Sequence, residues 1–433
     1  MAEPDGWSID RAMAEMTVAG VFGPGLRYVS FERDHYFAST LLFGTLTVTA
    51  GDDSDDAGGE GHRRQRQLAI KFKHRVPEMR AMCNNDLQFH NEILFFERIA
   101  PFLMACARST RDHECKHNRS RVTPLLPRYF YGRNDCGDRA SQDMVVLESV
   151  CLHEYRLSDQ LVYLDFDHLA VALRTLAKFH GLSYRAKHDD PVKFAETIAG
   201  VKETQWDADG QWYVRGDGLG KLLETALDRL AERHGDGMAA RRFRTELLGD
   251  ARRTLRHVME PVEPSAVLCH GDFNWNNLLF RYDSGGRPVD VMLVEMSNVR
   301  YGSPALDLSF FLYMNTDRRL RDARWDELLD AYCAALSSAV SDSAGAVWVP
   351  DRARLDEEMR EHSFYGLAHV SFSVRLMAEE HRQVDPAEFI NVDDDEALCL
   401  LLAFGGDRAT DTLADAVQHF LDISYNRTMS SLE

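Results

Sequence analysis

The chain has 433 residues, 45% of them hydrophobic, which is enough for two or three domains or for two lobes around a cleft. Its formal net charge is −19, with 69 acidic against 50 basic residues, and this acidity argues against a nucleic-acid or anionic-membrane partner. The N-terminal residues lack the basic and apolar regions of a signal peptide, and no apolar run approaches the roughly 18 residues of a membrane span. Eight cysteines without a C-x-x-C pair indicate reduced thiols, so we expect a cytoplasmic protein.

The first third of the chain alternates between apolar and polar residues as a β-sheet does. Strand-like runs occur at 26–32, 40–48, 67–73, 127–132 and 143–149. An acidic, glycine-rich stretch at 50–67 is typical of a flexible hairpin tip. Apolar residues at helical spacing predict one long helix from about Asp86 to Ala105. We therefore expect a five-stranded sheet with one helix after its third strand.

Beyond residue 150 the pattern becomes helical, with one strand-like island at 266–296. Helices are expected at 166–187, 218–258, 325–340, 352–382 and 409–429. The predicted fold is α+β and bilobal, with a small five-stranded antiparallel N-lobe and a larger, mainly helical C-lobe. The expected divisions are an N-terminal helical extension (1–25), the N-lobe (26–150) and the C-lobe (151–433).

Lys71 is the first candidate functional residue. In the strand "LAIKFK", Leu68 and Ile70 share one face, whereas Ala69, Lys71 and Lys73 share the other. If Ala69 lines a cleft, Lys71 also points into it. The alternative is that both lysines are solvated on the open face of an antiparallel sheet.

Glu92 lies within the apolar stripe of the predicted helix 86–105. A carboxylate on a buried face needs a partner, because an unpaired buried charge costs several kcal/mol. An ion pair with Lys71 would satisfy Glu92 and aim the lysine at phosphates. A nearby arginine or a backbone amide could also satisfy Glu92.

The stretch "LCHGDFNWNNLLF" (268–280) places several polar residues between two apolar runs. Asp272 could accept a proton from a hydroxyl nucleophile, and Asn277 could offer an amide oxygen to Mg²⁺. His270 is expected to brace the loop through hydrogen bonds. Glu295 ends a later apolar strand, and a hairpin would bring it beside Asn277 as a second metal ligand. Asp307, in an apolar helix, is expected to hold the loop by hydrogen bonds.

Other interpretations are open for these residues. The 268–280 stretch could be an ordinary polar turn, and Glu295 a surface acid at a strand end. A metal hydrolase built on His270 and Asp272 would need a second ligand cluster, which the sequence does not supply. The segment "DHECKH" (112–117) mimics a metal site but also lacks a second cluster.

The motifs "LAIK", "VVLESV", "HGDFNWNNLLF" and "VRYGSPALDLSFFLYMN", together with the inward Glu92, follow the order and spacing of the protein-kinase-like fold. More narrowly, the chain resembles the arthropod ecdysteroid kinase-like family, also called CHK kinase-like. This family is related to choline and aminoglycoside kinases. The resemblance runs from about Tyr28 to roughly Leu400.

The resemblance implies ATP- and Mg²⁺-dependent phosphorylation of a hydroxyl on a small molecule, such as an ecdysteroid or a hydroxylated xenobiotic. It implies that Lys71 holds the α- and β-phosphates, that Glu92 orients Lys71, and that Asp272 is the catalytic acid/base. Asn277 and Glu295 would bind Mg²⁺. The remaining positions implied for ATP are Ser39, Ala69, Glu148 and Val150. The catalytic loop would be 268–280, the metal-binding strand and loop 290–307, and helices within 194–258 and 352–405 would shape the acceptor pocket.

Two departures from the family pattern suggest an alternative, a catalytically weak or inactive pseudokinase that binds nucleotide or another small ligand. Glu295 stands where the family has an aspartate, which moves the carboxylate outward by roughly 1.5 Å, and Mg²⁺ tolerates little geometric error. The phosphate-covering segment 32–40 contains no glycine. Asp34 in that segment would repel phosphates unless it points outward and leaves the amides of 37–39 free.

Overall fold

The structure is a computed structural model. The residues it describes are 8–37, 40–50, 63–109, 125–135, 137, 140–160, 162–206, 215–341, 343, 345–379, 386–389 and 392–426. Within these residues, no helix is both long and apolar enough to cross a membrane.

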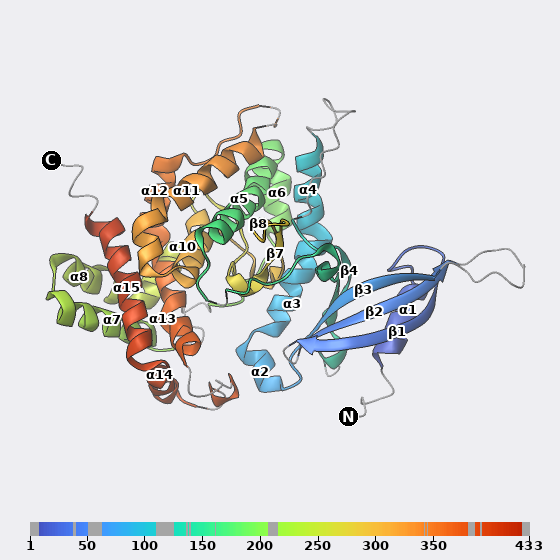
Figure 1. Ribbon diagram of the computed structural model, residues 1–433, viewed down its shortest axis with the longest axis horizontal. Helices are drawn as coiled ribbons and strands as arrows, with labels where there is room; N and C mark the ends of the chain where they lie inside the picture. Colours follow the sequence, from blue (N-terminus) through green and yellow to red (C-terminus); the bar gives the residue numbers. More distant parts are fainter. Residues whose placement is uncertain are drawn as a thin grey trace, which may run out of the picture.

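A five-stranded sheet forms the N-lobe, at the right of Figure 1. Its strands are β1 (Leu26–Phe37), β2 (Leu41–Ala50), β3 (Arg63–Phe72), β4 (Tyr129–Arg133) and β5 (Met144–Glu148). They run antiparallel in the order β1-β2-β3-β5-β4. Helix α1 (Ile9–Val18) packs its apolar residues on this sheet and completes a small core with Leu42, Leu68 and Ile70. The predicted N-lobe sheet is confirmed.

The predicted helix between the third and fourth strands is longer than expected. It comprises α3 (Asn85–Leu94), a π-helical turn (Phe95–Ile99) and α4 (Ala100–Ser109), and α2 (Pro77–Met82) precedes it. The apolar face of this helix between Leu94 and Leu103 joins the hydrophobic core of the helical lobe. This helix therefore belongs to both lobes, and Figure 1 shows α3 and α4 between the sheet and the helices.

The C-lobe is mainly helical, as predicted, and encloses one large core. Its helices are α5 (Phe166–Asp189), α6 (Pro191–Ile198), α7 (Gly218–His234), α8 (Met238–Phe243), α9 (Ala251–Met259), α10 (Pro304–Asn315), α11 (Arg318–Val340), α12 (Arg352–His362), α13 (Phe364–Ala378), α14 (Asp394–Ala403) and α15 (Gly406–Leu421). Phe364 and Phe372 are core residues.

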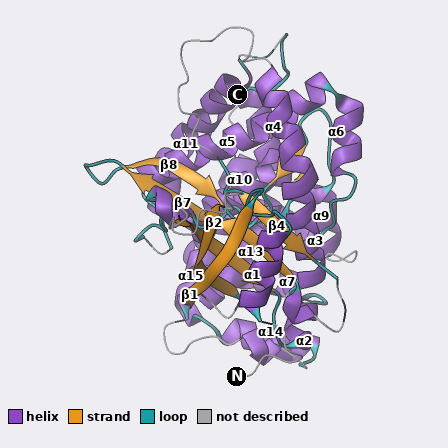
Figure 2. Ribbon diagram, turned by 90° about the vertical axis from the view of Figure 1, so that its right-hand side faces the viewer, coloured by secondary structure: helices purple, strands orange, loops and turns teal. Residues whose placement is uncertain are grey.

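Two short antiparallel sheets make up the predicted strand island. One pairs β6 (Val267–Cys269) with β9 (Arg300–Gly302), and the other pairs β7 (Leu278–Tyr282) with β8 (Pro288–Leu293). The β7–β8 turn projects outward at the left of Figure 2. The short 3-10 helix η8 (Met296–Asn298) lies between β8 and β9. The β6–β9 pair and the β7–β8 hairpin together carry two polar loops, one after β6 and one after β8.

Three sequence interpretations need correction. The first strand does not end at residue 32, because β1 continues to Phe37 with a bulge between Arg33 and His35. Residues 63–67 belong to β3 and not to a flexible tip, while 51–62 lie outside the described residues. The solvated alternative for Lys71 and Lys73 is wrong. Lys71 contacts Glu92 and Glu295, and Lys73, which follows β3, is buried and contacts Asp86 and Asp143. Acids on α3, just before β5 and just after β8 supply the compensating charge.

Candidate active site

Lys71 and Glu92 form the predicted ion pair. Lys71 lies on the β3 face that points toward α3, opposite the face of Leu68 and Ile70. Its Nζ is 2.9 Å from Oε2 of Glu92, whose side chain is 1% exposed. Glu92 also accepts a hydrogen bond from the backbone N–H of Met296. One buried carboxylate thus connects β3 to the loop that follows β8.

Glu295 is the second carboxylate at Lys71. It contacts Nζ directly and accepts a hydrogen bond of 2.5 Å from Oγ of Ser297. Glu295 has a φ of +67°, a left-handed conformation that is uncommon for residues other than glycine. This backbone geometry turns the end of β8 into η8 and directs the Glu295 side chain toward the N-lobe.

The charges of this cluster follow from burial and from the shared lysine. Burial alone would lower the pKa of Lys71, but Glu295 and Glu92 outweigh burial and raise it. Burial raises the pKa of Glu92, and the charge of Glu295 adds to this effect. Burial would also raise the pKa of Glu295, but Lys71 and Ser297 outweigh it and lower this pKa. Lys71 is therefore a cation and Glu295 an anion at neutral pH.

Asp272 and Asn277 form a second pair across one turn of the loop after β6. Asn277 Nδ2 donates to both the backbone carbonyl and Oδ2 of Asp272, at 2.9 Å each. Because Nδ2 is used in this way, Oδ1 of Asn277 remains an acceptor. Burial raises the pKa of Asp272 to about 6, and the negative charge of Glu295 contributes. The hairpin places the two loops side by side, since the Val294 N–H donates to the Asn277 carbonyl at 3.3 Å.

His270 braces the loop with both ring nitrogens. Nε2 is 2.9 Å from the Val294 carbonyl, and Nδ1 accepts from the Asp272 N–H at 3.3 Å. These contacts fix the neutral tautomer with its proton on Nε2. Burial lowers the pKa of His270, which favours the same neutral form. Because neither nitrogen is open to a metal, the hydrolase interpretation loses its histidine ligand.

Asp307 holds the backbone of the loop that follows β6. Its Oδ2 accepts from the His270 N–H at 2.7 Å and its Oδ1 from the Gly271 N–H at 2.9 Å. His180 Nε2 lies 3.1 Å from Oδ2. Burial would raise the pKa of Asp307, but His180 and the loop's hydrogen bonds outweigh it and lower this pKa. The hydrogen bonds expected of Asp307 are confirmed.

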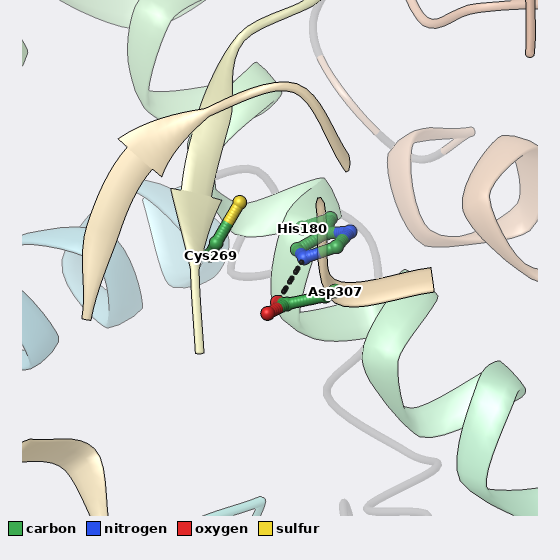
Figure 3. Close-up of side chains that lie close together, drawn as sticks. All are labelled: His180, Cys269 and Asp307. Atoms are coloured by element: carbon green, nitrogen blue, oxygen red, sulfur yellow. Dashed lines mark hydrogen bonds and ion pairs between the residues drawn. The ribbon is translucent and has the colours of Figure 1, made fainter. Parts of the chain in front are cut away.

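His180, Cys269 and Asp307 lie close enough to resemble a metal site (Figure 3). Burial and the charge of Asp307 raise the pKa of the Cys269 thiol well above its ordinary value, so the sulfur keeps its proton. Its Sγ donates toward the Ser303 carbonyl at 3.4 Å. Metal coordination needs a thiolate and free carboxylate oxygens, whereas both oxygens of Asp307 already accept hydrogen bonds. We interpret this cluster as structural support for the loop.

The family model that matches this chain is that of the ecdysteroid kinase-like family, over residues 37–343. The chain belongs to the ecdysteroid kinase-like family. A comparison with curated proteins found no match.

Several solved kinase structures resemble this family member at a distance. A microcompartment-associated aminopropanol kinase is 15% identical, over 96% of this chain and 99% of that one, with a TM-score of 0.39. The choline kinase LicA from Streptococcus pneumoniae is 10% identical over 91% and 93%, with a TM-score of 0.33. The GDP and kanamycin complex of APH(2")-IIia is 13% identical over 89% and 96%, with a TM-score of 0.35. The membership therefore rests on the family model.

The remaining positions that the ecdysteroid kinase-like pattern implies lie along the N-lobe and the connector. Ala69 is half-buried on the same face of β3 as Lys71, and Glu148 ends the neighbouring strand β5. Val150 is buried against Tyr155 and Met292. Ser39 lies outside the described residues. Asp34 is exposed on β1.

Several residues that shape this site were not predicted from the sequence. Ser297 and the Met296 N–H hold the two carboxylates, and neither belongs to a recognisable motif. Arg300 is buried and binds Glu203 at 2.9 Å. The sequence offered one signal for Arg300, namely a charged residue in a predominantly apolar region directly before "YGSPALDL".

Proposed function

We propose that this protein transfers the γ-phosphate of ATP to a hydroxyl group of a small molecule. The observation that carries this proposal is the convergence of two groups of side chains. Lys71 and its two carboxylates lie opposite Asp272 and Asn277, close enough for Glu295 and Lys71 to perturb the pKa of Asp272. Such a set supplies a phosphate-binding cation, oxygen ligands and a base, as phosphoryl transfer requires.

The nucleotide would bind between the lobes. Lys71 would contact the α- and β-phosphates while Glu92 keeps it oriented. The backbone of Glu148 and Val150 would meet the adenine, with Ala69 above the ring and Ser39 near the phosphates. Lys71 must leave Glu295 to do this, and the negative phosphates would replace the charge that it gives up.

Asn277 and Glu295 fit a divalent cation. The free acceptor of Asn277 is its Oδ1, and Glu295 is ionised, so both present the hard oxygen donors that Mg²⁺ prefers. A bound Mg²⁺ would neutralise charge on the transferred phosphoryl group.

Asp272 would act on the acceptor. Its carboxylate would accept the proton of the acceptor hydroxyl as the hydroxyl oxygen bonds to the γ-phosphorus and the bond to ADP breaks. Asn277 fixes the orientation of this carboxylate. His270 and Asp307 would hold the loop still without joining the proton transfer.

For the acceptor, we propose an ecdysteroid or another hydroxylated lipophile, including a xenobiotic. The family's description points to the first, and the net charge of −19 favours neutral over anionic acceptors. Helices α6 to α9 and α12 to α14 would shape its pocket.

The direct test is incubation with γ-labelled ATP and Mg²⁺ and a panel of steroid and xenobiotic alcohols. We expect labelled phosphate on at least one alcohol with the wild type and none with Asp272→Asn. Transfer that persists in Asp272→Asn would contradict the role of this carboxylate, and an absence of label on every alcohol would count against the kinase.

The second candidate is a pseudokinase, favoured by the contact of Glu295 with Lys71 and Ser297. If this contact prevents Lys71 from binding phosphates, Glu295→Asp should release Lys71 and raise turnover by orders of magnitude. For an active kinase we expect Glu295→Asp to change turnover by about tenfold or less, because the charge is kept. Turnover of both forms against Mg²⁺ concentration separates these two outcomes.

A further inference from the structure

A short non-helical segment crosses the interface between α3 and the segment between β8 and β9 (294–299), which we call the metal loop after its proposed ligand Glu295. This strap (201–206) follows α6 and runs past the face of α3 adjacent to Glu92. Asn91, the residue before Glu92, is fully buried and binds the strap at two points. Its Nδ2 donates to the Lys202 carbonyl at 2.7 Å, and its Oδ1 accepts from the Lys202 N–H at 2.9 Å.

The strap also reaches η8, the turn that follows Glu295. Thr204 Oγ1 donates to Oδ1 of Asn298 at 2.7 Å. Asn91 Nδ2 reaches the Ser297 carbonyl at 3.3 Å, so the same side chain contacts both the strap and η8. Helix, strap and η8 therefore share one buried network of neutral hydrogen bonds.

The far end of the strap is anchored in the C-lobe. Arg300 on β9 binds Glu203 at 2.9 Å and Gln205 at 2.5 Å, and it also contacts the hydroxyl of Tyr365 on α13. The strap is thus fixed to the same strand that follows the metal loop. It cannot shift without disturbing either β9 or α3.

We propose that the strap is a positioning element of the nucleotide site, acting through Asn91 and Asn298 to set Glu92 and Glu295 at their distance from Lys71. Adjacent α3 residues have separate tasks: Glu92 contacts Lys71 and Met296, and Asn91 fixes the helix that carries Glu92. This inference rests on the proposed nucleotide-binding function.

The strap's position between the lobes gives it this role. Glu92 is carried by α3, and Glu295 is carried by the β8–η8 junction, so their separation depends on how α3 sits against η8. The strap bonds to both elements through buried side chains, where hydrogen bonds are well shielded from water. Loss of one such hydrogen bond should therefore make the metal loop more mobile without unfolding the protein.

The test compares Thr204→Val with Thr204→Ser. Valine keeps the shape of threonine but removes the hydroxyl that reaches Asn298, whereas serine keeps that hydroxyl. The matched control is His90→Ala, because His90 Nε2 contacts the Gly200 carbonyl just before the strap at 2.9 Å. The dissociation constant of ATP is measured by calorimetry, with and without Mg²⁺, well below the melting temperature of every variant.

We expect Thr204→Val to weaken ATP binding in the presence of Mg²⁺ by about three- to tenfold, the effect of one neutral hydrogen bond. Its affinity for Mg²⁺-free ATP should stay near that of the wild type. Thr204→Ser and His90→Ala should both remain within about twofold of the wild type. Asn91→Ala, which frees α3 itself, should weaken ATP binding under both conditions.

A purely structural strap would give a different pattern. Thr204→Val would then melt at a lower temperature but bind ATP and Mg²⁺ as the wild type does, and this result would overturn the inference alone. A wild type that binds no ATP would overturn the proposed function and the strap's role together.

Discussion

Lys71 contacts one buried carboxylate, Glu92, and one half-buried carboxylate, Glu295, and these contacts set the charge of the site. Three charged groups share a small volume with a net charge of −1 when all are ionised, which explains why the pKa values of Glu92 and Glu295 move in opposite directions. Under the proposed function, a nucleotide would compete with Glu295 for Lys71. The contact would then reduce the affinity for ATP.

Asp272 should impose a pH dependence on phosphate transfer. Its pKa is raised from 3.8 to about 6, so the carboxylate form needed to accept a proton is lost below that value. We expect kcat/KM for the acceptor to fall about tenfold per pH unit below pH 6 and to level off above it. A profile that stays flat down to pH 5 would contradict the assignment of Asp272 as base.

The same shift has a consequence for stability. A carboxyl group whose pKa is higher in the folded state holds its proton there while the unfolded chain has lost it, so stability falls as pH rises from about 4 to about 6. Asp272→Asn should abolish this decrease and make the protein more stable than the wild type above pH 6. Urea unfolding at a series of pH values measures both effects. Parallel curves for the two proteins would show that the pKa is not raised.

Among the elements, the loop that follows β6 approaches η8 most closely at Gly271. This residue has a φ of +81°, and a Cβ atom built there would lie 1.8 Å from the Asn298 carbonyl oxygen. The loop therefore approaches η8 with only a hydrogen atom between them. The closeness fixes Asp272 relative to Glu295.

Gly271→Ala should be strongly destabilising. It combines left-handed strain of about 1–2 kcal/mol with a backbone clash, for a total of roughly 3 kcal/mol or more. The matched control is Gly286→Ala in the β7–β8 turn, where φ is +77° and no atom lies within 4 Å of the added Cβ. Gly286→Ala should lose only the stability that corresponds to the left-handed strain. Equal losses in urea unfolding would mean that the contact with Asn298 is unimportant.

Sequence patterns predicted those elements whose residues lie near one another in the chain. The strand alternation around Lys71, the helical spacing around Glu92 and the polar loop 268–280 all gave correct local structure. The Lys71–Glu295 contact joins residues 224 positions apart, and no local pattern encodes it. Asn91 and Lys202 are 111 positions apart, and the strap has no periodicity of its own, so neither could be predicted.

At the scale of the whole molecule, the two lobes are joined by more than the connector at residue 150. The helix that starts at α3 carries Glu92 at the N-lobe and ends with α4 packed in the C-lobe core. The sequence places the boundary between the lobes at residue 150, because the alternating pattern of the strands ends at that point. Packing crosses that boundary, since Phe95 and Ile99 bury themselves against C-lobe helices. Glu92 therefore lies on a helix whose continuation packs in the C-lobe core.

Thermal stabilisation by ATP, with and without Mg²⁺, is the most direct measurement of the central claim, made on the wild type and on Lys71→Ala. Each protein is compared with its own nucleotide-free form, which removes the effect of the substitution on folding. At about a hundred times its dissociation constant, ATP with Mg²⁺ should stabilise the wild type by roughly 2.7 kcal/mol. We predict a smaller shift without Mg²⁺ and none in Lys71→Ala. A shift that ignores Mg²⁺, or one that survives in Lys71→Ala, would contradict a nucleotide site built from Lys71, Asn277 and Glu295.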